Sequence, residues 1–302
     1  MNYRRLHYFL SIVDHGTVTA AAEELRIAQP ALSRQLRTLE SELKLNLFET
    51  RGNRLVLTPN GRAFVPLARQ LLIQTRNLQE AVDTMRTGQV SKLSAGATTA
   101  SVRGFLAPFI ATLGEDDPMI VVRDVSHFDL EEALMRDLDF VITPQVPSSS
   151  LASQPLGDVS LRAALPASHE WLAAGREHVL LADLVEHHLI LPSHHSVSRY
   201  VFDEALNRNG LRLGKHTECE DGLTLMALVT SGRGIGVSTE LPDFGVRRLE
   251  IREDAQGARP PLLRMHLAWQ RGHYAQEKIE ELAERMRPWV EQRQHVDPHN
   301  AK

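Results

Sequence analysis

A group of side chains in the stretch IAQPALSRQLRTLE, residues 27–40, could bind a polar, anionic partner. The group consists of Gln29, Pro30, Ser33, Arg34 and Arg37. At about 100° per residue, these positions share one helical face that is about 140° wide. An amide can bond an adenine edge with both of its polar groups, and a guanidinium can bond guanine in the same way. The face therefore has the chemistry to read duplex DNA, although each side chain taken alone could equally be solvated surface.

The elements that must position this face are helices packed behind it. The leucines that follow helical spacing on a different face are Leu32, Leu36, Leu39 and Leu43. They predict an anchoring side for the helix. Upstream, residues 3–14 are expected to form a helix that Gly16 ends, and Thr17 can cap a second helix. Pro30 suits the first turn of the third helix, so the segment predicts a helix-turn-helix.

A small wing and a long helix are expected to follow. Arg51 and Arg54 flank a turn between two extended pieces, from which they would reach phosphates or the minor groove. Thr58 can cap a new helix that begins at Pro59 and continues to about Thr87. At 1.5 Å per residue this helix is roughly 40 Å long.

The long helix carries apolar side chains every seven residues. These are Phe64, Leu71, Leu78 and Met85, supported by Leu67, Ala68 and Val82. A seven-residue repeat predicts a seam for a partner helix. Packing on its own domain is the alternative, but a helix this long beside some 60 residues favours dimerisation.

Charge and composition bound the remaining possibilities. The 302 residues allow about two domains. Residues 1–88 carry 12 Lys+Arg against 8 Asp+Glu, a net charge of +4, whereas the remainder carries 22 against 30, a net charge of −8. Such asymmetry is expected when only one domain meets a polyanion.

Neither a membrane span nor a disulfide is expected. Apolar runs such as residues 225–229 are too short to span a membrane. The single cysteine, Cys219, excludes an intrachain disulfide and fits the cytoplasm.

From Lys92 onward the sequence alternates between strand-like and helix-like segments. Residues 92–98, 119–125 and 139–143 are expected to be strands, with helices at 101–113 and 129–136 between them. After a loop, strands at 161–166, 188–192 and 235–238 alternate with helices at 198–210 and 223–234, and a last helix covers 274–292. This alternation predicts parallel sheet with helices on both faces, an α/β fold.

Residues 3–65 resemble the LysR-type transcriptional regulators. The resemblance is carried by the order of the helix-turn-helix, QPALSRQ, LE, LFE and LTPNG, and it extends along the chain through DFVIT and LVTSGRGIGVS. It implies a winged helix-turn-helix at 1–58, a linker and dimerisation helix at 59–88, and an effector domain with the type 2 periplasmic-binding-protein fold at 89–302. Subdomain I would cover about 92–160 and 267–302, and subdomain II about 161–266.

The resemblance also implies partners. They are double-stranded promoter DNA, a small-molecule effector, RNA polymerase and further copies of the chain, as a homodimer or homotetramer in the cytoplasm. One departure from the family is Ala28, where a serine or threonine is usual, so a hydroxyl that could cap the third helix is absent.

Hydroxyl side chains mark the expected effector cleft. They follow predicted strands or precede predicted helices at Thr98, Thr99, Ser101, Ser126, Thr143, Ser193, Ser196 and Ser198. By resemblance these segments line the effector site, and helix N-termini there favour anions. The expectation is a small anionic effector helped by Arg199 or His195, while helix capping alone is the alternative for each hydroxyl.

Other motifs predict neither a metal, a cofactor nor an enzyme. The pairs His187–His188 and His194–His195 lack supporting cysteine or carboxylate spacing. The glycines of residues 231–236 follow a helix and precede a strand, the reverse of dinucleotide-binding order, and indicate a helix end. With no catalytic motif present, the remaining alternative is an architectural DNA-binding protein without an effector response.

Overall fold

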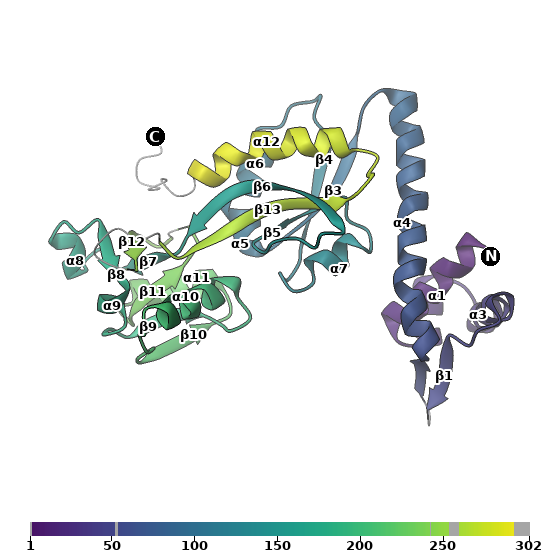
Figure 1. Ribbon diagram of the computed structural model, residues 1–302, viewed down its shortest axis with the longest axis horizontal. Helices are drawn as coiled ribbons and strands as arrows, with labels where there is room; N and C mark the ends of the chain where they lie inside the picture. The colour runs from purple at the N-terminus through teal and green to yellow at the C-terminus, as the bar shows by residue number, and fades with distance from the viewer. Residues whose placement is uncertain (1, 52–53, 242, 254–259, 293–302) are drawn as a thin grey trace. The chain divides into compact units, whose positions relative to one another are not determined.

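In the computed structural model, residues 2–51, 54–241, 243–253 and 260–292 are described. The chain forms two compact units, the first essentially Met1–Gly88 and the second beginning at Gln89 (Figure 1). None of the described helices is both long and apolar enough to cross a membrane.

Three helices pack around one small core in the N-terminal unit. They are α1 (Tyr3–His15), α2 (Val18–Glu24) and α3 (Gln29–Leu43). Gly16 ends α1 with a left-handed φ of 72°, and the Thr17 hydroxyl then accepts a hydrogen bond from the Ala20 N–H at the start of α2. Small alanines on α2 let the helices approach closely, and Phe9 is fully buried between them. The predicted helix-turn-helix is therefore present.

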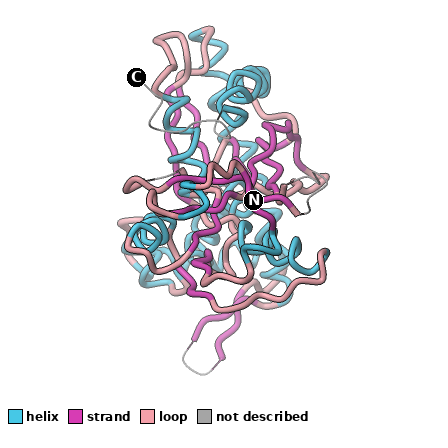
Figure 2. Tube along the Cα trace, turned by 90° about the vertical axis from the view of Figure 1, so that its left-hand side faces the viewer, coloured by secondary structure: helices cyan, strands magenta, loops and turns pink. Residues whose placement is uncertain are grey.

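A two-stranded wing follows α3. Strands β1 (Phe48–Arg51) and β2 (Arg54–Leu57) pair antiparallel, and Figure 2 shows them as the magenta hairpin at the bottom of the view. Helix α4 (Pro59–Thr87) begins after Thr58, whose hydroxyl accepts from the Gly61 N–H at 2.9 Å and donates to the Asn46 carbonyl at 2.7 Å. A side chain at Gly61 would place Cβ 2.0 Å from the Leu47 carbonyl oxygen, so only glycine fits where α4 crosses the wing.

The C-terminal unit contains a five-stranded sheet. Its strands are β3 (Lys92–Ala97), β4 (Met119–Asp124), β5 (Phe140–Thr143), β6 (Leu151–Ser160) and β13 (Leu262–Gln270), in the order β4-β3-β5-β13-β6. Apolar alternation buries both faces, because Phe140 and Ile142 join one hydrophobic cluster while Val141 joins another. Helix α12 (Gln276–Gln292) packs beside β6, and α7 (Leu130–Leu134) packs on β5 (Figure 1).

The helix expected at 101–113 is divided into three pieces. They are α5 (Thr99–Ser101), a π-helical turn (Val102–Leu106) and α6 (Ala107–Ile110). The π turn lies directly after residues that line the cavity described below, and such turns often occur beside functional sites. Sequence periodicity does not reveal it, because Phe105, Leu106 and Phe109 still fall on the buried side.

A second, six-stranded sheet completes the C-terminal unit. Its strands are β7 (Arg162–Leu165), β8 (His178–Leu180), β9 (Leu189–Pro192), β10 (His216–Cys219), β11 (Ile235–Ser238) and β12 (Arg247–Arg252), in the order β10-β9-β11-β7-β12-β8. Its helices are α8 (Glu170–Ala173), α9 (Leu181–Leu184), α10 (Val197–Arg208) and α11 (Gly222–Thr230). Helix α11 lies so close to β11 that a Cβ at Gly236 would be 2.7 Å from the Leu225 side chain.

The expectation of a parallel sheet holds for β3 with β4 and β5 and for β9 with β10 and β11, but is wrong for other strands in both halves of this unit. β13 runs antiparallel to β5 and β6, and β7 runs antiparallel to β11 and β12. β7 arrives directly from β6 in the other sheet rather than through a crossover helix, so nothing constrains it to a parallel direction. β13 starts at Leu262, ahead of position 267, and joins the first sheet along its whole length.

An ion pair on α12 makes a testable contribution to stability. The guanidinium of Arg285 donates to both carboxylate oxygens of Asp117, at 2.5 and 2.9 Å, and Lys278 Nζ lies 3.4 Å from Asp117 Oδ1. These bonds, led by those from Arg285, hold the pKa of Asp117 well below its ordinary range. The stabilisation is therefore present above the pKa of an unfolded aspartate, and is lost as the pH falls toward the lower pKa of the folded state.

We accordingly expect Asp117→Asn to lower the free energy of unfolding by about 1.5–3 kcal/mol at pH 7. The difference from the wild type should shrink as the pH falls below about 4, because the carboxyl of the unfolded wild-type chain then protonates while that of the folded protein stays ionised. Urea unfolding at pH 7 and at pH 3 measures both quantities. Asp116→Asn, at the exposed neighbouring residue, is the control, and an equal loss in the two variants would contradict the prediction.

Candidate functional site

The polar face predicted on α3 is open to solvent. Gln29, Pro30, Arg34 and Arg37 are exposed and Ser33 is half-buried, whereas Leu32, Leu36 and Leu39 are buried in the core. The division into two faces that the sequence predicts is therefore present.

Few interactions within the chain occupy the polar groups of this face. Gln29 Nε2 donates to Ser33 Oγ at 3.2 Å, and neither Arg34 nor Arg37 forms an ion pair with any described residue. Ala28 precedes α3 without a side-chain cap, so the first N–H groups of the helix receive no bond from it. The N-terminal half of α3 thus presents donors and positive charge, which is what a nucleic-acid surface would require.

Glu40 fixes the wing relative to α3. Its Oε1 accepts hydrogen bonds from the backbone N–H groups of Leu47, at 2.7 Å, and Phe48, at 3.1 Å. Two backbone donors at the entrance to β1 are satisfied by one carboxylate on α3. The sequence shows this residue only as part of a family motif, and its positioning role depends on contacts seven and eight residues away.

Arg51 and Arg54 are the two arginines of the wing. Arg51 is largely exposed, but its guanidinium lies 2.8 Å from Glu49 Oε1 on the same strand, so a phosphate would have to compete with this ion pair. The side chain of Arg54 lies outside the described residues, and its expected contact remains a prediction.

The predicted seam on α4 is partly exposed and partly internal. Leu67, Leu71, Leu78 and Val82 expose 61, 42, 65 and 54 % of their surface. Phe64 instead packs within the N-terminal core, with its ring centroid 5.4 Å from that of Phe9, and is not part of the exposed row. The Met85 side chain lies outside the described residues. The exposed row keeps the spacing of a coiled-coil face, starting at Leu67 rather than Phe64.

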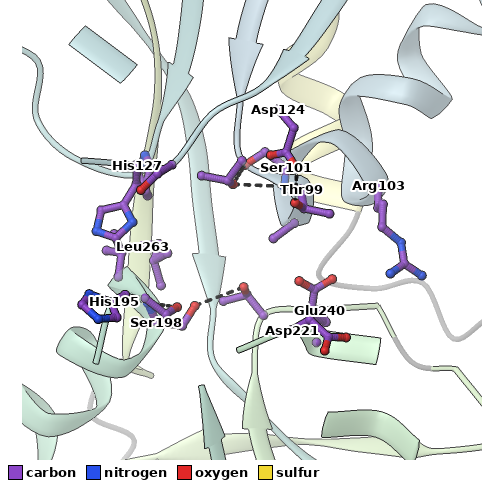
Figure 3. Close-up of a pocket in the computed structure, with 18 of the residues that line it drawn as sticks. Thr99, Ser101, Arg103, Asp124, His127, His195, Ser198, Asp221, Glu240 and Leu263 are labelled. Carbon is purple, nitrogen blue, oxygen red and sulfur yellow. Dashed lines mark hydrogen bonds between the residues drawn. The ribbon is translucent and has the colours of Figure 1, made fainter. Parts of the chain in front are cut away.

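A cavity of about 410 Å³ lies in the C-terminal unit, between segments of the two sheets (Figure 3). Its polar lining includes Thr98, Thr99, Ser101, Arg103, Asp124, Ser126, His127, His195, Ser196, Ser198, Glu220, Asp221, Thr239 and Glu240. Its apolar lining comes partly from β6 and β13, through Val159, Leu263 and Met265. These two strands join the sheets, so a ligand here touches both halves and the strands that connect them.

Most of the predicted hydroxyls meet at this cavity. Thr98, Thr99, Ser101, Ser126, Ser196 and Ser198 line it. Several also cap helices, as Thr98 does for Ser101 N and Ser196 for Ser198 N, so capping and lining are not exclusive. Ser198 and Thr239 are both buried, with their hydroxyls 3.3 Å apart across the wall.

Three residues expected at the site are directed elsewhere. Thr143 is buried, and its hydroxyl accepts from Gln145 N. Ser193 is buried and not part of the cavity lining, and its hydroxyl donates to Glu220. Arg199 is 97 % buried in ion pairs with Asp203 and Glu218, at 3.0 and 2.9 Å, so it cannot also hold an anion in the cavity.

The acidic lining was not foreseen from the sequence. Four carboxylates, Asp124, Glu220, Asp221 and Glu240, line the cavity with a single described arginine, Arg103. The expectation of an anionic effector does not fit this lining, since an anion would meet more negative than positive charge. The signal was available, because Asp124 ends a strand and Asp221 caps α11 by accepting from Thr224 N, the same positions that selected the hydroxyls.

His187 and His188, one of the two histidine pairs, contact neighbouring side chains. Among the described residues there is no cluster of three or more His, Cys, Asp or Glu that could hold one. His187 packs against Trp171, with ring centroids 4.8 Å apart, and His188 bonds Thr217. Cys219 is buried at the end of β10, where burial raises the pKa of its thiol, so it is suited to packing rather than redox chemistry.

Two family models match the chain. The model described as "Bacterial regulatory helix-turn-helix protein, lysR family" matches residues 3–62, and "LysR substrate binding domain" matches residues 86–291. The nitrogen assimilation regulatory protein nac of Escherichia coli is 35 % identical over 256 residues, which is 82 % of this chain and 81 % of that protein. The RuBisCO operon transcriptional regulator of Allochromatium vinosum is 28 % identical over 284 residues, covering 90 and 91 % of the two chains.

Solved structures show the same fold. A full-length OxyR variant from Pseudomonas aeruginosa superposes with a TM-score of 0.69 at 22 % identity, covering 95 % of each chain. Full-length CbnR, solved with its target DNA, superposes with a TM-score of 0.62 at 18 % identity, covering 95 % of this chain and all of that one.

Proposed function

This chain belongs to the LysR family, whose members are DNA-binding transcriptional regulators with an effector domain, and from this premise we propose which of its surfaces bind DNA, effector and partner chain. The family membership makes it a regulator and not an enzyme. We propose that the exposed face of α3 reads promoter DNA in the cytoplasm, that the cavity beside β6 and β13 binds the effector, and that α4 pairs two chains.

The observation that carries the DNA-binding proposal is the composition of the α3 face. Gln29 and Arg34 carry the groups that read base edges, and both are exposed near the start of a helix whose other side is fixed in a core. Arg37, one turn further along, is suited to phosphate. CbnR, which shares the fold, has been solved with its target DNA, which supports the same use of this domain here.

The cavity distinguishes this proposal from a purely architectural DNA-binding protein. An architectural protein would have its cleft filled by its own side chains, whereas about 410 Å³ is open between the two sheets. Volumes of this size are typical of small-molecule sites. We propose that effector binding changes the closure of the two halves about β6 and β13, and that paired dimers convey this to bent DNA and to RNA polymerase.

The proposed DNA-binding function is tested with the promoter fragment beside the chain's own gene. Because several arginines per dimer would displace counterions, we expect affinity for this fragment to fall about a thousandfold between 50 and 200 mM salt. Fluorescence anisotropy with a labelled fragment measures the slope, and a scrambled fragment of equal length is the control. Equal affinity for both fragments, or no dependence on salt, would refute the proposal.

A further inference from the structure

The charge of the proposed effector cavity identifies the kind of ligand it can hold. Asp124 comes from the five-stranded sheet, whereas Glu220, Asp221 and Glu240 come from segments around the six-stranded sheet. In Figure 3, Asp124 and Thr99 lie on one wall, and Glu240 and Asp221 on the facing wall. Glu240 and Asp221 are close together, because a Cβ at Gly222 would lie 2.2 Å from Glu240 Cγ. Negative charge is therefore present on both sides of the cavity.

Three of these carboxylates have only neutral hydrogen-bond donors among the described residues. Asp124 accepts from Thr99 Oγ1 at 2.6 Å, and Glu220 accepts from Ser193 Oγ at 3.1 Å. Asp221 accepts from Thr224 N at 2.8 Å, and its bonds to Thr224 lower the pKa of its carboxyl. These bonds come from neutral donors, so they do not cancel the charge of an ionised carboxylate.

The cationic groups of the lining do not balance this charge. Arg103 interacts electrostatically with Asp221, but it also lies 3.9 Å from Asp243 outside the cavity lining, and its side chain is 49 % exposed. This one guanidinium is the only described arginine beside four lining carboxylates. Burial is the main cause that lowers the pKa of His127, so this imidazole is largely neutral at pH 7. The cavity therefore carries net negative charge when its histidines are neutral.

The remaining lining is suited to hydrocarbon. Val159, Leu263 and Met265 form an apolar wall on the two connecting strands, and Leu223 adds to it from α11. A ligand that satisfies both kinds of wall has one or two cationic groups on a short apolar stem. An ammonium offers three hydrogen-bond donors and a guanidinium five, whereas an anion would leave the carboxylates facing like charge.

We propose that the effector of this cavity is a small organic cation, an amine or guanidine on a short hydrocarbon stem. This inference rests on the proposed function, in which the cavity is the effector site. In the absence of ligand, Asp124 repels the carboxylates across the cavity. A bound cation bridges the two walls and favours their approach, which gives the ligand different affinities for the open and closed states.

Matched probes separate charge from shape in the full-length protein. 1,4-Diaminobutane, succinate and 1,4-butanediol have four-carbon chains with cationic, anionic and neutral ends, and agmatine adds a guanidinium. We expect 1,4-diaminobutane or agmatine at 10 mM to raise Tm by several degrees in thermal-shift measurements, and succinate and butanediol to leave it unchanged. Stabilisation by succinate alone, or by neither cation, would overturn the proposal.

Variants locate the bound cation. Asp124→Asn and Glu220→Gln, tested as separate single variants, should each weaken cation binding about tenfold or more by calorimetry. Because two variants are measured, the test still works if one of them folds poorly. Glu186→Gln is the matched control, since Glu186 is exposed and lies outside the cavity lining. Equal affinity in all three variants would assign the cation to general surface charge and overturn the proposal.

DNA footprinting in parallel separates this inference from the function on which it rests. A cation that binds and alters the footprint supports both. A cation that binds without altering the footprint supports the ligand class and counts against the sensing role. A footprint that responds to succinate instead retains the sensing role and overturns the ligand class.

Discussion

Replacing Arg34 with alanine is expected to remove the preference of this protein for its own promoter. The guanidinium is exposed on the first turns of α3 and free of ion pairs with described residues, so no competing contact has to be broken before it meets a base. A two-pronged contact to guanine contributes about 1–3 kcal/mol of discrimination. Loss of that contact should reduce the ratio of specific to scrambled affinity about ten- to a hundredfold at each half-site.

The matched comparison for this prediction is Arg37→Ala. Arg37 has the same charge and exposure, but lies one turn further from the helix start, where a phosphate contact is expected. Its removal should weaken binding to all sequences alike and make the dependence on salt shallower. Footprinting and anisotropy on the two variants measure both effects. Full sequence preference in the Arg34 variant would mean that α3 is not the reading helix.

Local signals in the sequence specify the N-terminal unit well. Gly16, Thr17, Thr58 and Gly88 are residues whose preferred backbone or side-chain bonds begin or end a helix, and the structure uses each of them in that way. These signals act over three or four residues, so they can be read without knowledge of the fold. Glu40 could not be read in the same way, because its role appears only when the wing folds back onto α3.

Strands without an intervening helix were harder to foresee. β6 and β13 make the longest pairing in the C-terminal unit, yet residue patterns predict no strand at 151–160 and favour a return to the first sheet only at 267. Their partners are about a hundred residues apart, and polar side chains such as Gln154 and Arg264 interrupt the apolar alternation. A register shift at Met265/His266, opposite Gly157 at a φ of 129°, further disturbs the pattern.

The chemistry of the cavity shows a different limit. Strand ends and helix starts indicate most of the segments that line the cavity, because those positions converge at one edge of an α/β sheet. The hydroxyls and helix N-termini alone predict the wrong sign of charge, because Asp124 and Asp221 in the same segments also line the cavity. Arg199 directly follows four lining residues, but only the fold shows that Asp203 and Glu218 occupy its guanidinium.

Replacing Leu71 and Leu78 together with glutamate is expected to convert the protein to a monomer. Both side chains are exposed in the single chain and belong to the row that continues through Leu67 and Val82. Burying one leucine in an interface contributes about 1.5–3 kcal/mol. A two-fold dimer loses four leucines, or about 6–12 kcal/mol, which is comparable to or larger than the roughly 8 kcal/mol that holds a micromolar dimer together.

The consequence for DNA binding should be larger than that of any single base contact. A dimer binds two half-sites as one unit, whereas monomers must each bind at the affinity of one half-site, so apparent affinity should fall more than a hundredfold. Sedimentation gives the mass of the protein, and anisotropy with the promoter fragment gives the affinity. Gln70→Glu with Gln79→Glu is the matched control, because both glutamines are exposed on the same helix and lie about 90° around it from the centre of the leucine row. If the leucine variant still sediments as the wild type does at micromolar concentration, α4 does not pair through this row, and the exposed leucines serve another contact.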